Sequence, residues 1–100
     1  MSIGINDSLK NEIIKLARLY GIRKLTLFGS RARGDFRKTS DIDIAVSGGD
    51  VVGFSIDVNE ETNTLLKFDV INLDGPVQKE LLESIEREGV VLYEEIWKFL

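Results

Sequence analysis

Residues 25–46 read LTLFGSRARGDFRKTSDIDIAV, and this stretch decides the fold because it joins two short strands through a polar turn. The apolar run from Leu25 to Phe28 predicts a strand that stops at Gly29, and Ser30 then begins a segment too polar to continue it. A short helix is expected there, and the free N–H groups of its first turn would face a phosphate. The sequence thus predicts strand, Gly-Ser turn and helix in succession.

The second strand of this stretch carries two carboxylates. Asp41 and Asp43 are two residues apart, so strand periodicity places both on one face and the aliphatic residues between and after them on the other. Asp is depleted from strands, and neighbouring like charges are tolerated mainly where a cation or a shared proton neutralises them. Mg²⁺ takes carboxylate oxygen together with substrate phosphates and water. The pattern predicts a phosphate and metal site; an ordinary turn and a solvated strand face are the alternative for either piece alone.

The stretch resembles the signature of the DNA polymerase β-like nucleotidyltransferases, and especially of the short minimal nucleotidyltransferases. In that signature G-S is followed by ten residues and D-x-D, and this chain has Gly29-Ser30 followed at that spacing by Asp41 and Asp43. A phosphate-loop interpretation fails, because Asp-Phe follows Gly34 where Lys and Ser or Thr are required.

The resemblance implies an α/β (α+β) fold, in which a small mixed sheet has helices mainly on one face and an open face for the active site. It also implies transfer of AMP from ATP to a hydroxyl with two Mg²⁺ ions. Asp41 and Asp43 would be catalytic metal ligands, and Asp69 would match the family's third carboxylate on the neighbouring strand. Without the resemblance, Asp69 is equally an edge-strand residue in water, and Asp74 is more simply a turn residue.

The resemblance further implies which residues bind the nucleotide. Gly29 and Ser30 would hold the β- and γ-phosphates, and Arg31 or Arg33 would stabilise developing charge. The family also implies a partner, a small helical HEPN-type protein that is silenced by adenylylation of a tyrosine, so that this chain would be an antitoxin. The alternatives are a binding subunit that neutralises its partner by contact, and the nucleotide-binding subunit of a two-chain transferase with a small-molecule acceptor.

The composition restricts the chemistry. One hundred residues, 43% of them hydrophobic and 30% charged, predict a single domain over residues 1–100 with no room for an acceptor-binding domain. No Cys and no His are present, which leaves carboxylates as the ligands and bases. No apolar run approaches the ~20 residues of a membrane span and no signal-peptide pattern occurs, so a cytoplasmic protein is expected.

The net charge of −4 is unevenly distributed. Residues 23–38 carry six basic residues and one acidic residue, a local charge of +5, and the other residues carry −9. An acidic body argues against tracking along a nucleic acid, whereas one basic cluster suits a single nucleoside triphosphate. For Arg37 and Lys38, a solvated basic loop is as good an interpretation.

Hydrophobic periodicity and capping residues predict the supporting elements. These are a helix from Asn6-Asp7 through Tyr20, strands at Lys24–Phe28, 41–46 and Lys67–Leu73, a helix over most of 51–66, a helix from Pro76 to Gly89, and an edge strand at 90–93. Residues 51–58 also alternate like a strand, and the helix is expected there mainly because of the resemblance. The apolar residues 96–100 would cover the sheet or form a contact surface.

Overall fold

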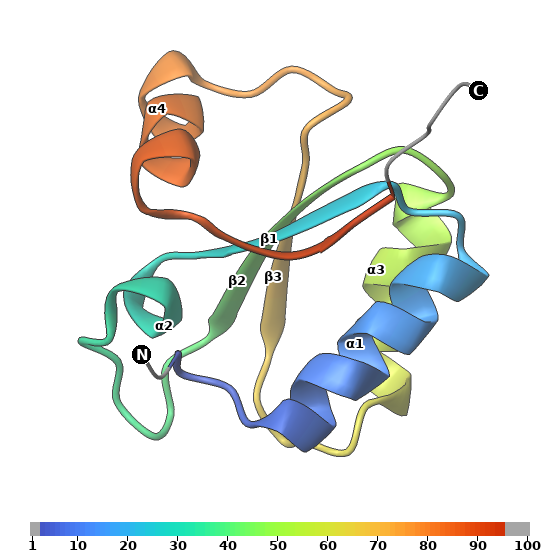
Figure 1. Cartoon of the computed structure of the whole chain (residues 1–100), viewed down its shortest axis with the longest axis horizontal. Helices are drawn as coiled ribbons and strands as arrows, with labels where there is room; N and C mark the ends of the chain where they lie inside the picture. Colours follow the sequence, from blue (N-terminus) through green and yellow to red (C-terminus); the bar gives the residue numbers. More distant parts are fainter. Residues whose placement is uncertain (1–2, 96–100) are drawn as a thin grey trace.

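The computed structural model describes residues 3–95, which form a four-stranded mixed sheet and four helices (Figure 1). The elements are α1 (Asp7–Leu19), β1 (Lys24–Phe28), α2 (Ser30–Arg33), β2 (Ile42–Ser47), α3 (Val51–Glu61), β3 (Phe68–Asn72), α4 (Lys79–Glu88) and β4 (Val90–Glu94). The strand order is β3-β2-β1-β4. β2 and β3 run parallel, and β1 pairs antiparallel with both β2 and β4. No helix in residues 3–95 is long and apolar enough to cross a membrane.

Local signals account for the ends of the long helices. The side chain of Asn6 accepts a hydrogen bond from the N–H of Leu9 at 2.8 Å and caps α1, which stops before Gly21 at a φ of 71°. Asp50 caps α3 in the same way through the N–H of Gly53, at 3.0 Å. Both helices therefore begin where the sequence predicts. α1 stops at Leu19, one residue before the predicted end, and α3 stops at Glu61.

The alternation of side chains along β2 separates the two faces of the sheet. Ile42, Ile44 and Val46 are each 0% exposed and pack in the main core with residues of α1 and α3. Asp43 and Ala45 point to the opposite face. The two long helices cover one face in Figure 1, so the carboxylate of Asp43 lies on the other.

The second face is only partly open, because α4 packs on it. Ile85 of α4 forms a small core with Phe28 and Ala45. Helices therefore lie mainly on one face, as expected from the resemblance, but α4 covers part of the opposite face, where it packs on Phe28 and Ala45. Figure 1 shows α4 on the side of the sheet opposite α1 and α3.

Several predicted bounds shift by a few residues. Asp41 lies just before β2, and β3 is one residue shorter at each end than predicted. α4 begins at Lys79 with Gln78 as its cap, so the prediction that Pro76 occupies a first helical position is wrong. A turn and an extended segment occupy residues 73–78 instead, because Asp74 and Gly75 form a turn after β3. The prediction about residues 96–100 lies outside the described residues.

Candidate functional site

Two carboxylates from neighbouring strands lie side by side at one end of the sheet. Asp43 of β2 and Asp69 of β3 are paired in register in the parallel ladder. Residues paired in this way point to the same face, so both carboxylates lie on the face opposite α1 and α3. Asp41 is exposed one residue before β2. The structure therefore brings together the three aspartates that the sequence analysis selected.

The Gly-Ser turn lies directly beside this group. Phe28 pairs with Asp43 across β1 and β2, so the next residue, Gly29, passes the carboxylate. Gly29 has a φ of 72°, and a Cβ atom built on it would collide with the Asp43 carboxylate. Only glycine meets both requirements at this position.

The electrostatics of the site agree with this geometry. The pKa of Asp43 is raised above its ordinary value of 3.8, first by burial and then by the negative charges of Asp69 and Asp41. The charge of Arg33 acts in the opposite direction. Asp69 and Asp41 are thus each close enough to act on the charge of Asp43, and Arg33 is close enough to oppose them.

Gly29 and Ser30 also start α2. The N–H groups of Ala32 and Arg33 donate to the carbonyl of Gly29, both at 3.1 Å. The N–H groups of Ser30 and Arg31 make no hydrogen bond to the protein in residues 3–95. Donors at the start of a helix beside a carboxylate group suit a phosphate bridged to a cation.

Arg31, predicted to contact the nucleotide, is used within the protein. Its side chain is 5% exposed and donates to the carbonyls of Gly4 at 2.6 Å and Ser40 at 3.0 Å. The same guanidinium donates to the carbonyls of Arg37 at 3.1 Å and Lys38 at 3.2 Å. These four bonds fasten the loop before Asp41 to the N-terminal segment, so Arg31 is occupied and only Arg33 is available among the two arginines.

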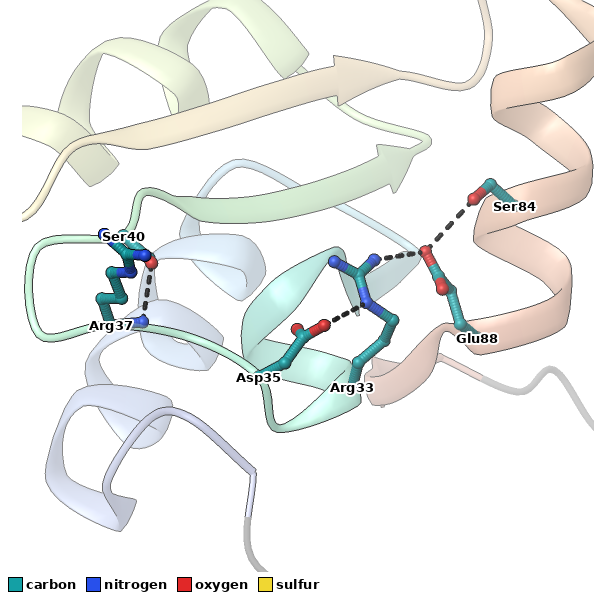
Figure 2. Close-up of polar contacts among 6 residues, drawn as sticks. All are labelled: Arg33, Asp35, Arg37, Ser40, Ser84 and Glu88. Atoms are coloured by element: carbon teal, nitrogen blue, oxygen red, sulfur yellow. Dashed lines mark hydrogen bonds and ion pairs between the residues drawn. The ribbon is translucent and has the colours of Figure 1, made fainter.

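Arg33 lies at the end of α2 between two carboxylates (Figure 2). Its Nε donates to Asp35 at 3.3 Å and its Nη1 donates to Glu88 of α4 at 3.0 Å. Glu88 also accepts a hydrogen bond from the Ser84 hydroxyl at 3.1 Å. The side chain of Arg33 is 44% exposed, so the guanidinium stays accessible to a ligand.

A magnesium ion suits the chemistry of these donors, although the protein alone does not complete a site. In residues 3–95 no group of three acidic, His or Cys side chains is arranged to hold a metal ion. None of the ion pairs formed by these residues involves Asp41, Asp43 or Asp69. Mg²⁺ is usually held by one or two carboxylates with the remaining ligands from substrate phosphates and water. The carboxylates fit that arrangement.

Two contacts around the site were not predicted from the sequence. Asn59 of α3 accepts from the N–H of Phe68 at 2.9 Å and donates to its carbonyl at 3.2 Å. These two bonds hold the start of β3, next to Asp69, against α3. Glu88 binds Arg33 across 55 residues of sequence. No local pattern signals either contact. Asp74 behaves as the predicted turn residue, and its carboxylate accepts from the N–H of Gly48 at 2.7 Å.

Asp41 and Asp69 are exposed, and Asp43 is half-buried. A cavity of about 490 Å³ lies between the start of α1, Arg31, Phe36 and the turn before β3. None of the three aspartates lines it. A second molecule can therefore approach the carboxylates directly from solvent.

Comparisons with known proteins point in one direction. Residues 11–96 match the family model described as polymerase beta, nucleotidyltransferase. A Methanocaldococcus jannaschii relative, provisionally named a protein adenylyltransferase, is 38% identical over 82 residues, which cover 72% of this chain and 79% of the relative.

Solved structures share the fold. A toxin–antitoxin complex crystallised with AMP-PNP contains a chain that matches with a TM-score of 0.71 at 26% identity, over 86% of this chain and 73% of that one. A Shewanella oneidensis complex of a tri-AMPylated HEPN toxin with its MNT antitoxin matches with a TM-score of 0.65 at 23% identity, over 87% and 71%.

Proposed function

This chain belongs to the polymerase β nucleotidyltransferase family, and we propose that it moves AMP from ATP to a hydroxyl of a separate protein. The observation that carries the proposal is the in-register pair Asp43 and Asp69 beside the Gly29-Ser30 turn. Neighbouring carboxylates beside N–H donors that have no partner within residues 3–95 suit a triphosphate bound together with a cation. The name of the M. jannaschii relative supports a protein as the acceptor.

In the proposed reaction the acceptor oxygen attacks the α-phosphorus of ATP. A bond forms between that oxygen and phosphorus, the bond from phosphorus to the α,β-bridging oxygen breaks, and pyrophosphate leaves with the electron pair. Mg²⁺, when bound, would be held by Asp41, Asp43 and Asp69 and would neutralise charge on the phosphates. Asp69 lies on the edge strand and would accept the hydroxyl proton, directly or through water.

The remaining residues of the site would bind and orient the triphosphate. The N–H groups of Ser30 and Arg31 and the hydroxyl of Ser30 would donate to the β- and γ-phosphate oxygens. Arg33 would place its positive charge against the phosphates as negative charge develops. The side chain of Arg31 would act indirectly, by holding the loop that precedes Asp41.

The acceptor in this proposal is a partner protein. The aspartates lie on an open face, so a docked protein would have to exclude water from the reaction. The toxin–antitoxin complex with AMP-PNP, at 26% identity, supports a toxin as that partner. By its resemblance to minimal nucleotidyltransferases, this chain would act as the antitoxin of a small helical HEPN-type protein and modify a tyrosine, in the cytoplasm. The whole of residues 1–100 would form the one domain that does so.

Co-expression tests the proposal. The chain would be produced with the helical protein encoded beside it, and the partner's intact mass would be measured. We expect a gain of one or more AMP units that disappears with Asp43→Asn. Asp74→Asn serves as the matched control, because it removes the same charge from a turn residue. An unmodified partner that is nevertheless neutralised would support action by contact alone and would refute the transferase proposal. Transfer to a small molecule only would refute the protein acceptor.

A further inference from the structure

Arg33 is the point where α2 and α4 meet. It lies in the last turn of the four-residue helix α2, and Glu88 of α4 is 55 residues away in sequence. The link between them is the hydrogen bond from Arg33 Nη1 to Glu88, at 3.0 Å (Figure 2). Asp35 contacts the guanidinium on the Nε side, at 3.3 Å.

Glu88 is held firmly enough to act as an anchor. Its side chain is 18% exposed, and the Ser84 hydroxyl donates to the same oxygen that receives the bond from Arg33. Glu88 lies one turn after Ile85, which α4 buries against Phe28 and Ala45 of the sheet. The position of the carboxylate is therefore set by packing on the same face that carries Asp43.

The two carboxylates leave part of the guanidinium for a ligand. An arginine has five N–H donors, and Asp35 and Glu88 take two of those of Arg33 in the described part of the chain. A half-exposed arginine loses considerable rotamer entropy when it binds a phosphate. Holding Arg33 in place beforehand reduces that loss, and planar guanidinium geometry then directs the remaining donors.

We propose that Glu88 is a positioning residue, which holds the Arg33 guanidinium in place to receive the triphosphate. The inference rests on the proposed function, because it assigns a purpose to a contact at the same site. A partly exposed ion pair contributes little to stability, so we assign this contact an orienting role. Competition between Glu88 and phosphate for Arg33 would have the opposite effect, because removal of Glu88 would then strengthen nucleotide binding.

Calorimetric titration of the full chain with ATP in the presence of Mg²⁺ distinguishes these effects. We expect Glu88→Ala to weaken binding about tenfold, the order of one charge-assisted hydrogen bond to phosphate. Glu88→Gln should retain most of the affinity, because its amide oxygen can accept from both Arg33 and Ser84. Glu86→Ala, on the same helix and with the same change of charge, should bind as the unaltered chain does. Binding by Glu88→Ala as tight as or tighter than this control overturns the proposal.

Two further measurements test whether Glu88 acts through Arg33. In an Arg33→Ala background, Glu88→Ala should cause no additional loss of affinity, and an undiminished loss overturns the proposal. Nuclear magnetic resonance of the Arg33 Nε–H group should give a rigid order parameter that falls below about 0.6 in Glu88→Ala and recovers in Glu88→Gln. An order parameter that does not change overturns the proposal even if the chain binds no ATP. Absence of ATP binding in the unaltered chain, by contrast, refutes the proposed function.

Discussion

Gly29 and Asp43 lie so close together that a Cβ atom at position 29 would collide with the carboxylate of Asp43. The Gly-Ser turn and the carboxylate of Asp43 are therefore one structural unit, formed where β1 ends opposite the start of β2. A change at either residue alters the other. In the proposed site, this contact joins the turn that would hold the triphosphate to a carboxylate that would hold the cation.

Gly29→Ala is expected to damage both stability and binding. The left-handed φ of 72° strains an alanine, and the added methyl group forces the Asp43 carboxylate to move. We expect the free energy of unfolding to fall by about 1–3 kcal/mol and Mg²⁺-dependent ATP binding to be lost. Urea unfolding and calorimetry would measure the two effects. Gly34→Ala is the control, because it is equally left-handed, at 96°, but has open space around it.

Asp43→Asn should abolish Mg²⁺-dependent ATP binding without unfolding the protein. The folded structure raises the pKa of Asp43, so the ionised form is disfavoured in the fold. The contribution of the Asp43 side chain to stability is therefore greatest below pH 3.8, where the carboxyl is protonated. It decreases as the pH rises through the higher pKa of the folded state. At pH 7 the uncharged asparagine should therefore raise the melting temperature slightly. Undiminished Mg²⁺-dependent binding would show that Asp43 is not a metal ligand.

The pKa of Asp43 can be measured in the metal-free protein. Carbon-13 resonances of the side-chain carboxyl, followed during a pH titration, should give a value above 3.8. Arg33→Ala should raise the pKa further, because a positive charge is removed, and Asp69→Asn should lower it, because a negative charge is removed. Opposite shifts would mean that these charges do not act on Asp43 as the structure indicates.

Asp69→Asn should abolish AMP transfer and largely retain ATP binding. Asp69 lies on the edge strand, where an acceptor can reach it, and it is the third carboxylate rather than a member of the D-x-D pair. Single-turnover transfer and calorimetry separate the two properties. Asp74→Asn should affect neither, since its amide oxygen can still accept from Gly48. The assignment of the third carboxylate is wrong if Asp74 is essential for transfer and Asp69 is dispensable.

Arg31 and Arg33 should respond differently to replacement by alanine. Arg31→Ala removes a buried guanidinium from four carbonyl acceptors, and we expect it to lower the free energy of unfolding by about 2–4 kcal/mol. Arg33→Ala should leave the free energy of unfolding within about 1 kcal/mol, because its ion pairs are partly exposed, yet it should weaken ATP binding. Equal loss of stability in both variants would contradict this division of roles.

The sequence by itself determined most of the local elements and suggested the chemistry of the site. Periodicity of apolar residues located β1 at its observed ends, and the cap at Asn6 and the stop at Gly21 located α1. These features are local, because they depend on backbone dihedral angles and on burial at a fixed spacing along the chain. The aspartates at strand spacing and the Gly-Ser turn likewise needed no knowledge of distant residues to suggest a nucleotide and a cation.

Only the tertiary structure decided which charged groups meet. The register of β2 and β3 places Asp69 beside Asp43. Packing of α4 on the second face brings Glu88 to Arg33. Arg31 is buried, whereas Arg33 in the same motif stays accessible. Such contacts join residues far apart in sequence, and the energy of a charge depends on its burial and its partners more than on its neighbours along the chain. The two arginines of one motif look alike in sequence, but burial and four carbonyl acceptors make Arg31 a support of the loop, whereas Arg33 stays accessible to solvent.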